Sequence, residues 1–373
     1  MTPARLKQTL DAFLQRRMEE DHIPGVDCSV FHHHKEIYRF RAGYADIDSG
    51  TPITEHTLYN IYSNTKVITC TAALQLYEQG YFLLDDPVSR YFPKMAQLSV
   101  AAKDGGTVPA QRTMTIRDLF RMTSGIAGGG DPSVGRQFFE ETGGACPAAL
   151  LPDYIARVPL QFEPGTDYCY GISHEVLAAL IEKITGMTFG AYLKQNIFEP
   201  LGMNNTAFDL SDCASDQLAT QYETQSGGQM PRAIGAKNCL IPPILRESAS
   251  GGLISSVDDY MKFQEALCSG TTLLGRGTIN LMRLDHLEDC QRANYGGTVL
   301  GWGYGLGVRT IIDQARAASP VGYGPFGWGG AAGTYGSIDP ENEITVFYAQ
   351  HIFGTNEALT HRGLNNIVYS ALL

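Results

Sequence analysis

The sequence lacks the segments that mark a membrane protein or a nucleic-acid-binding protein. No apolar run is long enough to cross a bilayer, and residues 1–7 lack the uninterrupted apolar core of a secretory signal. The 28 lysines and arginines are fewer than the 39 aspartates and glutamates, and they are scattered rather than gathered into a basic stripe. We therefore expect a cytoplasmic globular protein that binds neither membrane nor nucleic acid.

The eight cysteines form no Cys-x-x-Cys pair and are spread along the chain. We expect them to be reduced and mostly buried, without a structural disulfide. Three adjacent histidines, His32-His33-His34, invite a metal interpretation. Adjacent side chains of a strand point to opposite faces, and no second cluster at ligand spacing supports an ion. We therefore expect a solvated turn there, and neither a metal nor an organic cofactor.

Several enzyme motifs are also missing. No Gly-x-Ser-x-Gly occurs, which argues against the nucleophile elbow of an α/β-hydrolase. No His-Glu-x-x-His occurs, and no phosphate-binding glycine loop is convincing. His174 could be taken for a triad base, but it lies in a turn into a helix, and we expect it to be structural.

The order of elements predicts one sheet built from both ends of the chain. Strands are expected at 26–31 and 36–44 around the histidine turn, and again at 334–338 and 344–348. Apolar residues at helical spacing predict helices near the N-terminus and at 64–80, 174–185, 188–198, 256–268 and 359–372, whereas the glycine-rich segment 125–147 is expected to be a loop. We predict a single α/β (α+β) domain over 1–373, with an α/β subdomain (1–62 and 250–373) and an inserted, mainly helical subdomain (63–249).

The first chemical motif is Ser63-Asn64-Thr65-Lys66, which stands at the start of the helix predicted over 64–80. Residues three apart on a helix share a face, so the Lys66 amine can reach the Ser63 hydroxyl. A serine is a poor nucleophile until a base takes its proton, and a lysine can be that base where its surroundings favour the neutral amine. The helix start also offers free backbone N–H groups to an oxyanion. Alternatively, Ser63 caps the helix and Lys66 is solvated.

Other segments decide between these two interpretations. The turn Pro164-Gly165-Thr166 is followed by Tyr170 and a helix. Together with Ser63-x-x-Lys66 it resembles the motifs of the serine β-lactamase and penicillin-binding-protein family, specifically of the class C β-lactamase type. Further stretches resemble that family in its own order: Leu83-Leu84-Asp85-Asp86-Pro87, Met122-Thr123-Ser124-Gly125, Pro200-Leu201-Gly202-Met203 and Gly251-Gly252-Leu253. The resemblance implies a β-lactamase-like fold with an antiparallel sheet flanked by helices.

The resemblance also implies roles for individual residues. Ser63 would be the nucleophile, Lys66 and Tyr170 would relay its proton, and the N–H groups of Ser63 and Ala331 would form the oxyanion hole. Two positions depart from the β-lactamases, which have asparagine where this chain has Ile172 and a Lys-Thr-Gly or His-x-Gly motif where it has Trp328-Gly329-Gly330. At these two positions the chain resembles the family VIII carboxylesterases and the lovastatin-type acyltransferases.

From these resemblances we expect a serine hydrolase that cleaves small carboxylic esters through an acyl-enzyme. Ile172 cannot hydrogen-bond a substrate amide, and Trp328 offers a flat apolar wall in place of a cation. Glycine at 329 and 330 would let the backbone approach the acyl group closely. Three alternatives stay open: a β-lactamase or amide hydrolase, an acyltransferase, and a catalytically silent ligand-binding relative on the same fold.

Overall fold

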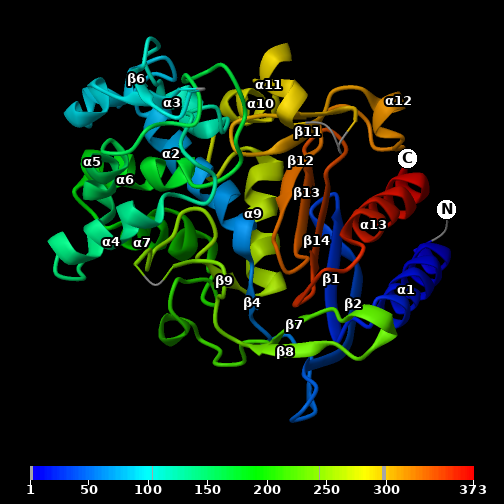
Figure 1. The fold of residues 1–373 in the computed structure, drawn as a ribbon. Coiled ribbons are helices and arrows are strands. Elements are labelled where there is room, and N and C mark those ends of the chain that lie inside the picture. The colour runs from blue at the N-terminus through cyan, green and yellow to red at the C-terminus, as the bar shows by residue number, and fades with distance from the viewer. Residues whose placement is uncertain (1–2, 103, 243, 296–299) are drawn as a thin grey trace.

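The computed structural model describes residues 3–102, 104–242, 244–295 and 300–373. Within these residues the main sheet has eight antiparallel strands, and both ends of the chain supply them (Figure 1). In spatial order they are β10 (Trp302–Tyr304), β11 (Arg309–Ile311), β12 (Phe326–Gly329), β13 (Tyr335–Asp339), β14 (Ile344–Ala349), β1 (Gly25–His32), β2 (Lys35–Asp46) and β3 (Thr51–Pro52). The two ends meet where Val30 of β1 lies opposite Val346 of β14. The predicted sheet from both termini is confirmed.

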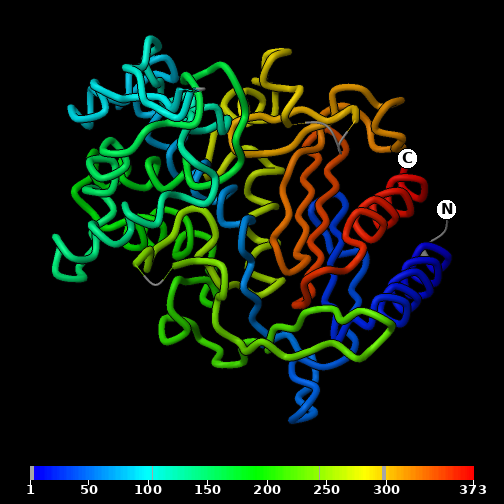
Figure 2. Tube along the Cα trace, viewed as in Figure 1, coloured from blue at the N-terminus to red at the C-terminus, as the bar shows by residue number. Residues whose placement is uncertain are grey.

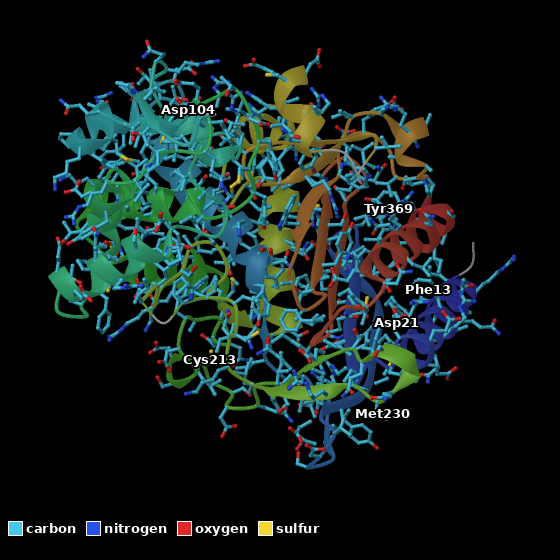
Figure 3. The ribbon with its side chains drawn as sticks, viewed as in Figure 1. Phe13, Asp21, Asp104, Cys213, Met230 and Tyr369 are labelled. Carbon is cyan, nitrogen blue, oxygen red and sulfur yellow. The ribbon has the colours of Figure 1, made fainter. Side chains whose placement is uncertain are left out.

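Helices cover both faces of this sheet. The terminal helices α1 (Pro3–Glu20) and α13 (Glu357–Leu372) pack together on one face, and α9 (Val257–Ser269) lies against the other (Figures 1 and 2). Phe13 of α1 and Tyr369 of α13 are both buried in the core under the terminal helices (Figure 3). The absence of a side chain at Gly363 lets α13 approach the Phe13 ring closely.

The middle of the chain is mainly helical and packs beside α9. Its centre is α2 (Thr65–Glu78) against α6 (Ser173–Thr185), both of which bury most of their residues. The other helices are α3 (Ile116–Phe120), α4 (Pro132–Glu141), α5 (Leu151–Ile155), α7 (Phe189–Leu193), α8 (Glu199–Leu201), α10 (Arg276–Arg283), α11 (Asp289–Tyr295) and α12 (Gln314–Ala317). Short 3-10 turns cover Tyr62–Asn64, Val88–Arg90, Pro93–Ala96, Ala148–Leu150, Leu210–Asp212 and Ser226–Gly228.

Three small sheets join these parts. β4 (Tyr59–Asn60) pairs with β9 (Ile254–Ser255), and β5 (Ser99–Ala101) pairs with β6 (Thr107–Pro109). β7 (Gln221–Glu223) lies between β8 (Arg232–Gly235) and β15 (Ile352–Phe353). β4 ends three residues before Ser63, and β9 begins directly after Gly251-Gly252-Leu253, so their pairing brings these two motifs together.

Two expectations about the helical region are corrected. The segment 125–147 is not a loop throughout, because α4 occupies Pro132–Glu141. Asp131 caps this helix by accepting from the Ser133 amide, Pro132 stands in its first turn, and Val134 and Phe138 bury one face. These signals outweigh the surrounding glycines. The helix expected over 188–198 is present as α7 (Phe189–Leu193), but its second half is a π-helical turn from Lys194 to Phe198 rather than α-helix.

The histidine turn lies at the tip of the β1–β2 hairpin, as expected. His33 and His34 both have positive φ, and they pair with Glu343 and Glu265 through their Nδ1 atoms at 2.6 and 2.8 Å. Only His34 belongs to a group of donor atoms close enough for one ion, together with Glu265 and the buried Cys268. The three adjacent histidines therefore do not converge on one point.

All eight cysteines are free thiols, as expected, but the expectation that most are buried is wrong. Only Cys28, Cys70 and Cys268 are buried, whereas Cys239 and Cys290 are exposed. Both exposed cysteines lie in surface segments outside the strands and the long core helices, which a count along the sequence could not show.

Among the described residues no single helix is long and apolar enough to span a membrane. The bent pair Ser173–Thr185 and Phe189–Leu201 passes the same length and composition test jointly, with a bend of 77° between the two helices. Its first helix buries nine residues in the protein core.

Candidate active site

Ser63 stands in a strained turn that leads into α2. The preceding residue, Tyr62, has a positive φ of 45°, a conformation that costs energy for a residue with a side chain. Burial of the Tyr62 ring, the hydrogen bond that its hydroxyl donates to Gln221 and the contact of the same hydroxyl with the Cys239 thiol hold this conformation. No pattern in the sequence signalled it.

Lys66 lies one helical turn after Ser63 and is almost completely buried. Its Nζ donates to Ser63 Oγ at 3.3 Å and to the Ser250 carbonyl oxygen at 2.5 Å. The same Nζ lies 4.6 Å from the centre of the Tyr170 ring. Lys66 is therefore not solvated, and the interpretation of Ser63-x-x-Lys66 as an exposed helix start does not fit this structure.

A buried carboxylate holds the segment that contacts Lys66. Glu175, in the first turn of α6, accepts from Ser248 Oγ at 2.6 Å, from the Ala249 amide at 3.1 Å and from the Ser250 amide at 3.0 Å. The carbonyl oxygen of the same residue, Ser250, is the one that Lys66 contacts. The sequence analysis missed Glu175, since only the fold brings its helix to the segment 248–250.

Tyr170 lies over Lys66 and is held on its other side by Trp328. The Trp328 indole N–H donates to the Tyr170 hydroxyl at 2.8 Å, and the two rings stack with centres 5.3 Å apart. The Tyr304 ring meets Trp328 edge-on, 5.1 Å away. This aromatic group brings the predicted Tyr170 and Trp328 together on one side of Ser63.

The predicted glycines lie at the end of β12. A side chain on Gly330 would meet the Ile61 carbonyl oxygen at 2.3 Å and Thr334 Oγ1 at 2.2 Å. Glycine at 330 therefore allows this strand end to approach the turn that carries Ser63 closely. The next residue, Ala331, lines the same cavity as Ser63, and its amide N–H has no acceptor among the described residues.

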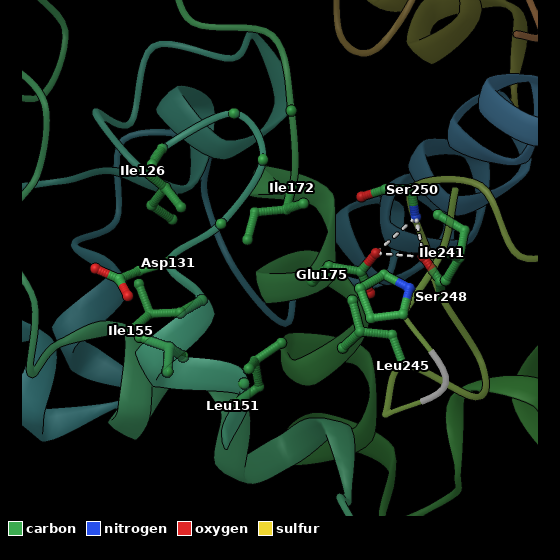
Figure 4. Close-up of a pocket in the computed structure, with 18 of the residues that line it drawn as sticks. Ile126, Asp131, Leu151, Ile155, Ile172, Glu175, Ile241, Leu245, Ser248 and Ser250 are labelled. Atoms are coloured by element: carbon green, nitrogen blue, oxygen red, sulfur yellow. Dashed lines mark hydrogen bonds between the residues drawn. The ribbon is translucent and has the colours of Figure 1, made fainter. Parts of the chain in front are cut away.

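The cavity beside Ser63 has a volume of about 790 Å³. Of the predicted site residues, Ser63, Lys66, Tyr170, Ile172 and Ala331 line it, whereas Trp328, Gly329 and Gly330 do not. Figure 4 shows Ile172 pointing into its middle, between Ser250 on one side and Ile126 on the other. Much of the remaining wall is apolar and comes from residues within 126–139, 151–160, 240–242 and 244–245.

His174 is placed as a core residue. Its side chain is fully buried, its Nε2 lies 3.2 Å from the Phe120 carbonyl oxygen, and Cys70 Sγ lies 3.6 Å away. Burial, together with the nearby Lys66, lowers the pKa of His174 to about 3. The ring has no contact with Ser63, which agrees with the expectation of a structural role.

Sequence comparisons assign the chain to a family. The beta-lactamase family profile matches residues 10–368. Protein Rv1367c of Mycobacterium tuberculosis (strain ATCC 25618 / H37Rv) is 31% identical over 343 residues, covering 87% of this chain and 85% of its own. Esterase EstB of Burkholderia gladioli is 27% identical, with 92% and 90% covered. The chain is thus a hydrolase of the β-lactamase fold, and it belongs to the beta-lactamase family.

Solved structures confirm the predicted fold. "EstCE1, a hydrolase with promiscuous acyltransferase activity" matches with a TM-score of 0.77 at 24% identity, covering 98% of this chain and 99% of that one. A LovD9 mutant of simvastatin synthase from Aspergillus terreus matches with a TM-score of 0.80 at 22% identity, covering 99% of each chain. At these identities the likeness concerns the fold alone.

Proposed function

We propose that this chain is a carboxylesterase that acts through an acyl-enzyme on Ser63. The observation that carries the proposal is the contact between Lys66 Nζ and Ser63 Oγ at the edge of a largely apolar cavity. A buried amine at hydrogen-bond distance can take the hydroxyl proton as the oxygen attacks. The name of esterase EstB points in the same direction.

In the proposed reaction Ser63 Oγ bonds to the ester carbonyl carbon while its proton passes to Lys66. The amides of Ser63 and Ala331 would stabilise the oxyanion. The C–O bond to the alcohol then breaks, and Tyr170 delivers the proton to the departing oxygen. Water, or a second alcohol in an acyltransferase reaction, adds to the acyl-enzyme by the reverse sequence of proton transfers, and Ser63 regains its proton.

The cavity wall favours an uncharged ester over a β-lactam. A β-lactamase needs a polar group for the acylamide side chain, and Ile172 supplies none. It also needs a cation for the ring carboxylate. Among the described residues that line the cavity, the only cations are Lys66, which is committed to Ser63 and Ser250, and the exposed Arg136 on α4.

The test compares kcat/KM for p-nitrophenyl butyrate, nitrocefin and benzylpenicillin on one preparation. We expect the ester to be turned over much faster, with β-lactams leaving a slowly hydrolysed acyl-enzyme. Ser63→Ala should abolish turnover and fluorophosphonate labelling with little change in melting temperature. A β-lactam preferred by tenfold or more would refute the esterase, and a wild-type protein that neither turns over esters nor takes the label would be a silent relative.

A further inference from the structure

The cavity extends well beyond the space that the reacting ester group needs. It starts at Ser63 and Ser250, passes Ile172 and continues to Ile126 and Ile155 (Figure 4). Its volume of about 790 Å³ lies in the range of sites that enclose a whole small molecule. An acetyl or butyryl group would leave most of it unfilled.

The far part of this cavity is apolar. Six of the side chains that form it are aliphatic: Ile126, Leu151, Ile155, Ile172, Ile241 and Leu245. They come from separate segments, before α4, in α5, before α6 and after β8, so the fold assembles this surface from distant parts of the chain. Aliphatic walls of this kind bind a hydrocarbon chain by removing it from water.

The polar groups that line the cavity do not prevent a hydrocarbon chain from binding there. The Glu175 carboxylate is fully committed to the segment 248–250 through its three hydrogen bonds. Asp131, Arg136 and Glu140, on or beside α4, also line the cavity, and all three are exposed. Asp131 lies beside Ile126 and Ile155 (Figure 4), where it caps α4 by accepting from the Ser133 amide. The acidic and basic groups of this wall that the structure describes are therefore either hydrogen-bonded within the protein, like Glu175, or exposed to solvent.

The position of Tyr170 determines which half of the ester faces this space. The alcohol oxygen must receive a proton, so the alcohol lies next to the Tyr170 hydroxyl. That hydroxyl is hydrogen-bonded to Trp328, which does not line the cavity. With the carbonyl oxygen held by the amides of Ser63 and Ala331, the acyl chain extends away from Trp328 and into the aliphatic part.

We propose, on the basis of the esterase function above, that the cavity binds a medium-length apolar acyl chain, from hexanoyl to decanoyl. The natural ester would then carry a fatty or branched aliphatic acyl group rather than acetate. The chemistry is unchanged: Ser63 Oγ replaces the alcohol on the carbonyl carbon, and water then releases the free carboxylic acid.

A series of p-nitrophenyl esters from acetate to decanoate tests this assignment in the wild-type protein. Burial of one methylene can contribute up to about fourfold, although ordering the chain consumes part of that gain. We expect kcat/KM to rise at least about tenfold from acetate to octanoate, mostly through KM. A maximum at acetate or butyrate with a decline at hexanoate would overturn the assignment and leave the esterase intact.

Two variants place the acyl chain within the cavity. Leu245 is half-buried on the side of Ser248 and Ile241, and Ile155 is buried on the opposite side, near Ile126. Leu245→Phe should lower kcat/KM for octanoate about tenfold and hardly change that for acetate. Ile155→Phe should affect decanoate most. Leu83→Phe, at an exposed position outside the cavity, is the matched control.

The two proposals fail in different ways. Absence of turnover for every ester, or unchanged turnover in Ser63→Ala, would refute the esterase. Equal losses for acetate and octanoate in Leu245→Phe, in a protein that melts like the Leu83→Phe control, would refute the acyl cavity alone. Should Ile155→Phe fold poorly, the Leu245→Phe comparison still decides the question.

Discussion

The residues on the two sides of Ser63 differ in chemical character. On one side Lys66 donates to Ser63 and lies against the Tyr170 ring, and Trp328 donates to the Tyr170 hydroxyl and stacks on the same ring. On the other side aliphatic side chains surround an open cavity. Proton transfer needs fixed distances, whereas a hydrocarbon chain needs volume and a dry surface. Substitutions should therefore affect every ester equally on the first side and selectively by acyl length on the second.

The largest effect is expected from Lys66 and Tyr170. Lys66→Ala and Tyr170→Phe should each lower kcat by at least about a hundredfold, the usual scale for acid–base groups, and by the same factor for butyrate and octanoate esters. Because the two groups act as one relay, the double variant should be little worse than either single variant. Tyr81→Phe, at an exposed tyrosine, is the control. Losses that multiply fully would contradict a shared relay.

A smaller loss is expected at Glu175, which positions Lys66 through the backbone of Ser250: Glu175 accepts from the Ser250 amide, and Lys66 donates to the Ser250 carbonyl oxygen. In Glu175→Gln one carboxylate oxygen becomes an NH₂ that cannot accept from the 248–250 segment. We expect kcat to fall about tenfold and stability to fall by about 1–3 kcal/mol, the scale of an unsatisfied buried group.

Glu182 offers a matched control for this variant. It lies on the same helix and also accepts two backbone amides, from Ala149 at 2.8 Å and Phe189 at 3.0 Å, far from Lys66. Glu182→Gln should reduce the melting temperature with kcat unchanged. If Glu175→Gln behaves in the same way, Glu175 only stabilises the fold and does not position Lys66.

The sequence was sufficient for features that depend on local spacing. Ser63 and Lys66 share a helix face, the strand pairs flank short turns, and both were predicted from neighbouring residues. Glu175, Tyr62 and the aliphatic cavity were not, because each depends on segments far apart in the chain. The glycines of 125–147 concealed α4, although the cap at Asp131 was present. Trp328 was identified as a site residue, but its contact is with Tyr170, not with the cavity.

Trp328→Phe should have a modest effect that does not depend on the acyl chain. The change keeps a ring for stacking but removes the N–H that donates to the Tyr170 hydroxyl. That hydrogen bond stabilises negative charge on the phenol oxygen, so we expect kcat to fall about three- to tenfold, the scale of one hydrogen bond to a charged group. Trp302→Phe, which removes the other indole, is the control. A loss of kcat confined to esters with long acyl chains would mean that Trp328 contacts the acyl chain, which would contradict the assignment of Trp328 to the proton-transfer side of Ser63.

The smallest expected effect is on the stability of the protein in mild acid, and it comes from the buried His174. His174 faces Lys66 and Cys70, and burial lowers the pKa of His174 to about 3, from the ordinary 6.5. Below pH 6.5 the unfolded chain therefore binds a proton that the folded chain does not bind. His174 thus lowers stability as pH falls towards 3, by at most about 1.4 kcal/mol per pH unit.

Other buried groups contribute with both signs. Burial lowers the pKa of His351 to about 4 and of His361 to about 3, and these act like His174. Burial raises the pKa of Asp27 to about 6 and of Glu357 to about 7, so their folded forms take up protons and oppose the loss. These contributions oppose one another, so a difference between variants is needed to isolate His174.

The measurement is the melting temperature of wild type and His174→Gln at pH 7 and pH 5. We expect His174→Gln to melt at a lower temperature than wild type at pH 7, because a buried ring is lost. The difference between the two melting temperatures should narrow at pH 5, because the unprotonated, buried His174 lowers the stability of the wild type there and the variant has no such group. His22→Gln, at an exposed position, should keep a constant gap. A constant gap for His174→Gln would mean that this ring takes up its proton equally in the folded and unfolded chains, which its burial beside Lys66 does not allow.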